Sequence, residues 1–166
     1  MIMSERKEFL TEQIITYLGN KRSLLSFIDN AINLILHELN AKKIDVFDVF
    51  AGSGIVSRYL KQYSNNLYTN DLEDYCNTIN RCYLTNEDEI DLNELKYWFN
   101  HINLLLNNQP LLKDGFISRL YAPANDNDIK IGERVFYTSR NAQYIDTARQ
   151  YIETVPEPYK TLLLGP

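Results

Sequence analysis

The 166-residue sequence has little of what several classes of protein require. It contains two cysteines and two histidines: Cys76 and Cys82 are six residues apart, and His37 and His101 have no second ligand close in sequence. Neither arrangement matches a zinc or redox motif, so we expect free thiols and no metal. No apolar run approaches the roughly 20 residues that span a bilayer, and the N-terminus is not a signal peptide. We therefore expect no membrane association and a cytoplasmic location.

An excess of positive charge is also missing. The chain has 17 Lys and Arg against 22 Asp and Glu, which gives a formal net charge of -5. This balance argues against nucleic-acid binding through bulk positive charge, although it leaves room for local contacts with DNA. With 45% hydrophobic and 23% charged residues, the composition is that of an ordinary globular protein, and the length suits one domain.

The first half of the sequence predicts alternating helices and strands. Leucine and isoleucine recur at helical spacing over residues 21–40, which predicts a long amphipathic helix facing a core. Residues 44–50 combine β-branched and aromatic side chains and lead to glycine, as a buried parallel strand does. A helix over residues 55–63 and a strand over 67–70 follow. Together they predict a right-handed strand, helix, strand crossover whose first turn opens at the carboxyl edge of the sheet.

The second half predicts mostly helices. Apolar spacing indicates helices over residues 72–83, 91–106 and 140–155, with an acidic linker at residues 87–89. Residues 107–132 are rich in Asn, Asp, Pro and Gly, which predicts irregular surface structure. The apolar run over residues 161–166 indicates the start of a further element.

Two glycines and two carboxylates predict a nucleoside site. Gly52 and Gly54 directly follow the predicted strand and would let the backbone approach a ligand. The parallel crossover would bring Asp71, at the end of the next strand, alongside this turn, where its carboxylate can accept hydrogen bonds from both ribose hydroxyls. Asp48 precedes the glycines. The third glycine of a dinucleotide-binding motif is replaced by Ser57, which disfavours a nicotinamide cofactor without excluding it.

A possible site for an anionic group lies upstream, at Lys21. The residues Gly19-Asn20 form a turn before the predicted helix, and a lysine is unfavourable at a helix N-terminus. An anionic ligand there would relieve the repulsion, while a solvated lysine is the alternative.

Three motifs together resemble the DNA adenine methylase family. They are Tyr17-Leu18-Gly19-Asn20-Lys21, the segment Asp48-Val-Phe-Ala-Gly-Ser-Gly54 and the step Asn70-Asp71. The resemblance implies an α/β, Rossmann-like methyltransferase fold that depends on S-adenosylmethionine, of which this chain would form the N-terminal half with a helical and loop-rich insertion. It also implies methyl transfer to the N6 amine of adenine in double-stranded DNA, from which the adenine is flipped out.

The resemblance assigns the cofactor contacts residue by residue. Tyr17, Leu18 and Lys21 would bind the methionine end, Asp71 the ribose, and Leu72 the adenine. The residues expected to line the cofactor at the turn are Asp48, Phe50, Ala51, Gly52, Ser53 and Gly54. The cofactor-binding core would span residues 14–86 and a helical and loop region with a DNA-recognition role residues 87–140, while residues 141–166 would form a helix and the start of the next element.

The sequence departs from the family in lacking its catalytic Asp/Asn-Pro-Pro-Tyr/Phe motif. The nearest segment, Pro156-Glu157-Pro158-Tyr159, has a residue between the prolines and no acid or amide before them. We therefore expect a truncated chain that binds cofactor and does not transfer a methyl group by itself. A missing C-terminal half, or a complementary subunit, would complete its sheet.

Local DNA contacts are expected from basic residues in the loop-rich region, where the family resemblance places target recognition. These residues are Lys113, Arg119, Lys130, Arg134 and Arg140. Five acidic residues share the region, so a mixed surface charge is the alternative. Three functions stay open: a portion of a restriction-modification adenine methyltransferase, a non-catalytic cofactor- or DNA-binding half-protein, and a nicotinamide-dependent oxidoreductase.

Overall fold

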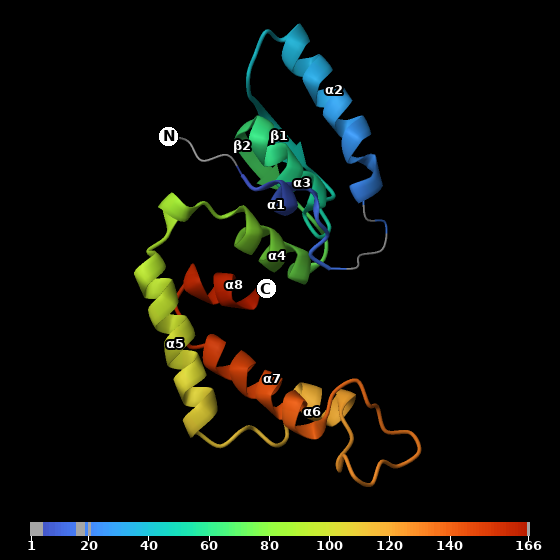
Figure 1. Cartoon of the computed structure of the whole chain (residues 1–166), viewed down its shortest axis with the longest axis vertical. Coiled ribbons are helices and arrows are strands. Elements are labelled where there is room, and N and C mark those ends of the chain that lie inside the picture. The colour runs from blue at the N-terminus through green and yellow to red at the C-terminus, as the bar shows by residue number, and fades with distance from the viewer. Residues whose placement is uncertain (1–4, 16–18, 20, 166) are drawn as a thin grey trace. The chain divides into compact units, whose positions relative to one another are not determined.

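The structure, a computed structural model, describes residues 5–15, 19 and 21–165. The chain forms two compact units, the first extending to Asn86 and including Gly165, and the second running from Glu87 to Leu164 (Figure 1). The elements of the first unit are α1 (Lys7–Thr11), the 3-10 helix η1 (Arg22–Leu24), α2 (Leu25–Glu38), β1 (Ile44–Asp48), α3 (Ile55–Leu60), the 3-10 helix η2 (Lys61–Tyr63), β2 (Ser64–Thr69) and α4 (Asp74–Leu84). The expected helix, strand, helix, strand, helix order is confirmed.

The strands β1 and β2 pair in parallel, joined through α3. Val46 lies opposite Leu67 and Asp48 opposite Thr69, with an irregularity between Ile44 and Val46. Helix α3 packs on both strands, as a crossover requires. The described residues thus contain the small parallel sheet of an α/β unit, and no third strand among them joins it.

The expectation that residues 44–50 form a buried strand is wrong in two respects. Strand β1 ends at Asp48, and none of its residues is buried. Phe47 of β1 is 60% exposed, and its neighbour in register on β2, Tyr68, is 57% exposed. The sequence pattern of a core strand is present, but within the described residues β1 has one neighbouring strand, so its side chains stay partly open.

Helix α2 is shorter than expected and only part of its apolar face is covered. Leu25 is buried, whereas Leu24 and Leu39, which the spacing also placed on the core side, are 51% and 63% exposed. The helix is held to its unit by Asp29, whose carboxylate accepts hydrogen bonds from the hydroxyls of Tyr59 at 2.8 Å and Tyr63 at 2.6 Å. The Tyr63 bond and then the Tyr59 bond lower the pKa of Asp29.

Helix α1 is anchored by the buried side chain of Arg58 in α3. The guanidinium donates to the carbonyl oxygens of Phe9 and of Glu12, the latter at 2.6 Å, and lies 5.5 Å from the centre of the Phe9 ring. Both carbonyls belong to the C-terminal end of α1, where the last oxygens have no partner within the helix and carry partial negative charge. Arg58 therefore acts as a cap for α1 supplied by another element.

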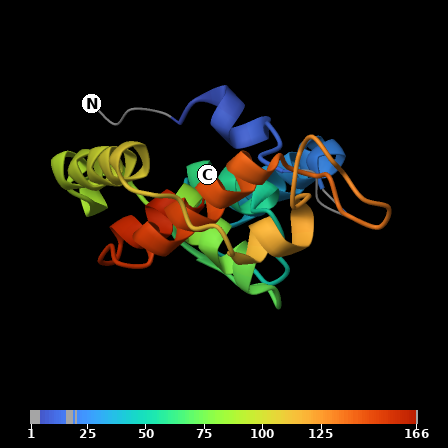
Figure 2. The same ribbon diagram turned by 90° about the horizontal axis from the view of Figure 1, so that it is seen from below.

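The second unit consists of helices around one apolar core. Its elements are the 3-10 helix η3 (Glu87–Glu89), α5 (Leu92–Asn108), α6 (Phe116–Tyr121), α7 (Ser139–Ile152) and α8 (Tyr159–Leu164). Ile102 and Leu106 of α5, Val155 after α7 and Tyr159 of α8 form the buried cluster, and Ala148, Tyr151 and Ile152 of α7 pack against it. Figure 2 shows the ribbons of these helices from below. The helices expected over 91–106 and 140–155 are confirmed within a few residues at each end, and α5 begins after Asp91, whose carboxylate accepts from the Asn93 N–H at 2.8 Å.

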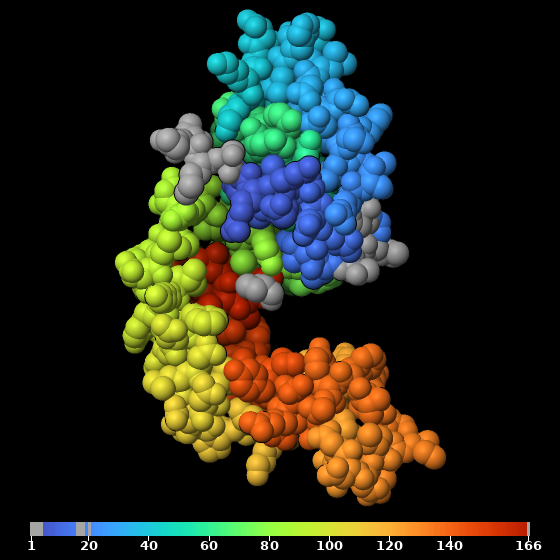
Figure 3. All heavy atoms as spheres, in the orientation of Figure 1, coloured from blue at the N-terminus to red at the C-terminus, as the bar shows by residue number. Residues whose placement is uncertain are grey.

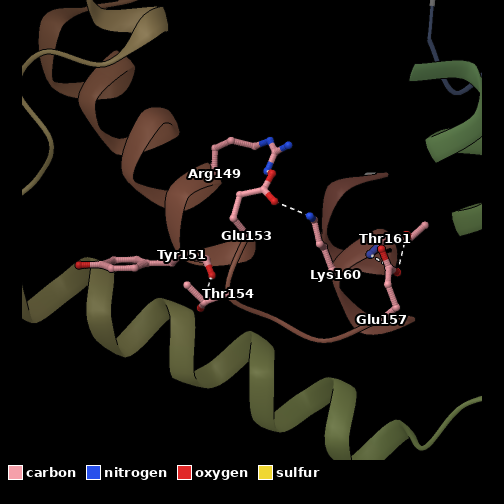
Figure 4. A network of polar contacts seen from close by, with 7 residues as sticks. All are labelled: Arg149, Tyr151, Glu153, Thr154, Glu157, Lys160 and Thr161. Carbon is pink, nitrogen blue, oxygen red and sulfur yellow. Dashed lines mark hydrogen bonds and ion pairs between the residues drawn. The ribbon is translucent and has the colours of Figure 1, made fainter. Parts of the chain in front are cut away.

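A polar network joins the end of α7 to α8 (Figure 4). The Glu153 carboxylate forms ion pairs with Arg149 of α7 and Lys160 of α8. The hydrogen bond from Lys160 and then that from Arg149 lower the pKa of Glu153. Glu157 accepts from the Thr161 hydroxyl at 2.7 Å and thereby caps the start of α8. The two helices are thus linked by side chains as well as through the shared core.

The expectation that residues 107–132 are irregular throughout is wrong, because they include α6. This six-residue helix is too short for apolar periodicity to reveal, and α7 holds its N-terminus. The Asp146 carboxylate accepts from the Ile117 N–H at 2.9 Å and the Ser118 N–H at 2.8 Å. A Cβ at Gly115 would lie 2.1 Å from Cγ of Asp146, so this approach requires glycine.

Candidate functional site

The glycine turn lies where the carboxyl ends of the two strands meet. Past the last strand residues, the Asn70 N–H donates to the Asp48 carbonyl at 2.9 Å, and the Ala51 N–H donates to the Asn70 carbonyl at 3.0 Å. Gly52 and Gly54 both have positive φ, of 54° and 76°. Gly54 is the N-cap of α3. The turn is therefore fixed to β2 on one side and leads directly into a helix on the other.

Asp71 lies beside this turn, as the crossover predicts. Its Oδ2 accepts from the Gly52 N–H at 2.7 Å, and its Oδ1 accepts from the Glu73 N–H at 3.1 Å. These hydrogen bonds, the one from Glu73 first and that from Gly52 second, lower the pKa of Asp71. The carboxylate is thus an ionised acceptor at the carboxyl end of the sheet, and hydrogen bonds from the Cys76 side chain and the Leu72 N–H also favour its ionised form. A role in binding ribose stays a prediction.

The other expected cofactor residues of the first unit divide into exposed and buried sets. Phe50, just before the glycines, and Leu72, just after Asp71, are 76% and 93% exposed. Ala51, Gly52, Ser53 and Gly54 are buried. A ligand at this edge would therefore meet the exposed Phe50 and Leu72 and the half-buried Asp71 before the buried backbone of the turn.

Asp48 and Lys21 contact the segments on either side of the two glycines, Asp48 contacting α3 and Lys21 contacting Phe50. The Asp48 Oδ2 accepts from the Ser57 hydroxyl at 2.6 Å, which links the end of β1 to α3. The Lys21 ammonium donates to the Phe50 carbonyl at 3.3 Å, so a positive charge from the N-terminal segment lies at the carboxyl end of β1. Tyr17 and Leu18, which were expected to act together with Lys21, lie outside the described residues.

Sequence reasoning missed Asn80 of α4. This side chain is 2% exposed and donates to the Gly52 carbonyl at 3.0 Å, so it contacts the turn from the side opposite Asp71. The available signal was a polar residue among the apolar positions of a predicted helix, since Cys76 and Ile79 share its buried face. Nothing local indicated that its amide would reach residues 28 positions away.

The expected DNA-binding residues of the second unit are all exposed, and three of them share a hollow. Lys113, Arg119 and Arg134 line an open hollow of about 600 Å³ next to α6, whereas Lys130 and Arg140 lie outside it. The loop of residues 122–138, drawn in orange, stands out from the surface of its unit (Figure 3). Arg134 lies over the Tyr121 ring at 5.3 Å, which ties this loop to α6.

Three of the five acidic residues of this region accept hydrogen bonds from backbone N–H groups. Asp126 accepts from the Ser139 N–H at 2.9 Å at the start of α7, and Glu133 accepts from the Ala124 N–H at 3.0 Å within the loop. Asp146 holds α6, as described above. The other two pair with lysine or arginine: Asp114 with Arg119, and Asp128 with Lys130. Within the described residues, no carboxylate pairs with Lys113, Arg134 or Arg140.

The segment nearest to a catalytic motif is part of the core. Tyr159 is 7% exposed, and its hydroxyl accepts from the Asp91 N–H at 3.4 Å. The aromatic ring of Pro156-Glu157-Pro158-Tyr159 therefore packs inside the second unit. Over the described ranges, no three His, Cys, Asp or Glu side chains converge as a metal site would require. No helix there is long and apolar enough to span a membrane.

The first unit is thus an α/β unit in which a glycine turn and an ionised aspartate meet at the carboxyl ends of parallel strands, the edge where open α/β sheets bind ligands. Comparison with known proteins then gives the family. Residues 17–163 match the D12 class N6 adenine-specific DNA methyltransferases, and the chain belongs to this family.

A curated relative supports the family assignment. Over 142 residues the chain is 30% identical to the Type II methyltransferase M.NlaIII of Neisseria lactamica. The match covers 84% of this chain and 38% of that relative, so the chain spans about two fifths of the relative's length. No solved structure matches the chain.

Proposed function

We propose that this chain supplies the S-adenosylmethionine site of a DNA methyltransferase acting on the N6 amine of adenine. The hydrogen bond between the Gly52 N–H and the Asp71 carboxylate, at 2.7 Å, carries the proposal. It holds an ionised acceptor at the ligand-binding edge of the sheet, where both hydroxyls of a ribose can donate to it. When bound, the cofactor supplies the methyl group.

The side chains around the turn suit the other parts of this cofactor. Leu72 and Phe50 are exposed apolar groups that neighbour Asp71 and the glycine turn in sequence, and an adenine ring can pack against them. Lys21 brings a cation to the same edge through its bond to the Phe50 carbonyl, and an ammonium there can bind the carboxylate of the methionine end. We propose that Tyr17 and Leu18 bind the methionine end of the cofactor together with Lys21. Asp48 holds α3 through Ser57 and thus supports the turn.

We further propose that the second unit contacts DNA through its exposed basic residues. Because Asp126, Glu133 and Asp146 are engaged by N–H groups of α7, the loop and α6, they leave the cations of Lys113 and Arg134 available. Phosphate binding by such cations fixes a protein on DNA without reading sequence. The family membership favours this substrate over the nicotinamide cofactor of an oxidoreductase.

Methyl transfer itself is proposed to need residues that these 166 do not provide. The Asp/Asn-Pro-Pro-Tyr/Phe motif is missing from the sequence, and Tyr159 is a core residue. A further segment of the same protein, or a complementary subunit, would supply the acceptor for the target amine and the ring that stacks on the flipped adenine. The reading frame after Pro166 distinguishes these sources, because an in-frame copy of the motif supports the first and a stop codon the second.

Calorimetry with S-adenosylmethionine tests the cofactor proposal. We expect binding to the chain and a Kd at least tenfold higher for Asp71→Ala, because the loss of hydrogen bonds to a charged group is worth about 1.5–3 kcal/mol. Asp74→Ala is the matched control, since this exposed acid lies three residues further on and has no side-chain partner among the described residues. The proposal fails if the folded chain does not bind, or if the two variants bind equally.

The salt dependence of DNA binding tests the second unit. With a mixed-sequence duplex, Lys113→Ala with Arg134→Ala is expected to reduce the slope of log Kd against log salt by about 2, one for each lost phosphate contact. Lys96→Ala, on the exposed face of α5, is the control. An unchanged slope in the double variant would show that the hollow beside α6 does not bind phosphate.

A further inference from the structure

The Asn80 side chain is a buried polar group with an unusual set of contacts. Its amide nitrogen donates to the carbonyls of Gly52 at 3.0 Å and Cys76 at 2.8 Å. Its oxygen Oδ1 is buried and has no hydrogen-bond partner among the described atoms. A buried acceptor without a partner is unfavourable, and natural proteins keep few of them. The two hydrogen bonds that the amide nitrogen donates to Gly52 and Cys76 therefore keep the amide in this orientation.

The Asn80 oxygen is directed toward the second glycine of the turn. A Cβ built on Gly54 would lie 2.2 Å from Oδ1 and 3.3 Å from Cγ of Asn80. The amide thus packs directly against the Gly54 backbone, while its nitrogen binds Gly52. A single side chain from α4 consequently contacts both glycines of the turn.

Both backbone polar groups of Gly52 form hydrogen bonds with side chains. Its N–H donates to Asp71 at 2.7 Å, and its carbonyl accepts from Asn80 at 3.0 Å. A glycine rotates easily about φ and ψ, so its conformation depends on such partners. If Asn80 releases the carbonyl, the peptide groups around Gly52 can turn, and the N–H leaves the Asp71 carboxylate.

We propose that Asn80 is a positioning residue of the cofactor site: by fixing the Gly52 carbonyl, it keeps the Gly52 N–H on the Asp71 carboxylate and so holds that carboxylate in place for the ribose. The inference rests on the proposed function, because it takes Asp71 as the ribose acceptor. Because Asn80 is 2% exposed, it acts through Gly52 and not through a contact with the ligand.

Amide hydrogen exchange in the cofactor-free chain tests the positioning step. Asn80→Ala is expected to accelerate exchange of the Gly52 amide about five- to tenfold, which corresponds to one lost hydrogen bond. Asn77→Ala, an exposed position on the same helix, is expected to leave the Gly52 rate unchanged. Should Asn80→Ala fail to fold, Asn80→Ser takes its place, because a serine hydroxyl can still bond the Cys76 carbonyl and is too short to hold Gly52. An unchanged Gly52 rate in the folded variant overturns the inference.

Calorimetry with S-adenosylmethionine tests its consequence. Asn80→Ala is expected to raise the Kd about five- to tenfold in the native background and hardly at all in the Asp71→Ala background, since it acts through Asp71. Equal losses in both backgrounds would show a general structural effect and overturn the proposal. If the native chain does not bind while exchange at Gly52 responds to Asn80→Ala, the proposed function fails and the role of Asn80 in shaping the turn stands.

Discussion

Replacing Gly54 by alanine is expected to destabilise the first unit more than replacing Gly19, although both glycines have a φ of 76°. The backbone penalty of a left-handed alanine is about 1–2 kcal/mol and applies to both. At Gly19 no described atom lies within 4 Å of the added Cβ. At Gly54 the Cβ would lie 2.2 Å from Oδ1 of the buried Asn80, and such overpacking adds about 1–3 kcal/mol. The expected loss at Gly54 is therefore about 2–5 kcal/mol.

Hydrogen exchange of the Ala51 and Asn70 amides measures this loss, because both donate between the ends of β1 and β2. A loss of about 2 kcal/mol accelerates exchange roughly thirtyfold, and larger losses accelerate it further. Adding Asn80→Ala to Gly54→Ala should restore part of the protection, since the clash partner is then removed. If Gly54→Ala and Gly19→Ala accelerate exchange equally, the close packing of Asn80 against the turn is refuted.

Three further changes test the anchoring of the helices. Arg58→Met is expected to release α1, because the carbonyls at its C-terminal end lose their donors; limited proteolysis should then cut within residues 5–15 faster than in the native chain, and equal rates would contradict this. Asp91→Ala removes the N-cap of α5 and should lower the free energy of unfolding of the second unit by about 1 kcal/mol in urea titrations followed by Trp98 fluorescence. Desolvation raises the pKa of Asp146, but hydrogen bonds from α6 outweigh it and lower the pKa below its ordinary value. The ionised form therefore stabilises the fold above the unfolded pKa, and this contribution is lost as the pH falls through the folded pKa. Asp146→Asn should be less stable than the native chain at neutral pH, with a difference that narrows as the pH falls through the lowered pKa of Asp146; a constant difference would contradict the assignment.

The sequence by itself determined the order of elements in the first unit and the place of the candidate site. Hydrophobic spacing and two glycines predicted a strand, a turn, a helix and a second strand, because these patterns reflect local backbone preferences. The parallel crossover then required Asp71 to lie near Gly52, and the structure brings them to 2.7 Å. Resemblance in three short motifs indicated the family, which the comparison confirms.

Tertiary structure alone decided which side chains hold these elements in place. Asn80 reaches Gly52, Arg58 caps α1 and Asp146 starts α6, and each contact joins residues 28 or more positions apart. No local pattern encodes such pairs, because they depend on how helices pack. The exposure of Phe47 likewise depends on the neighbours that β1 has and not on its own residues. The sequence specified where the glycine turn forms, and the packing of α4 against it helps to determine how that turn is held.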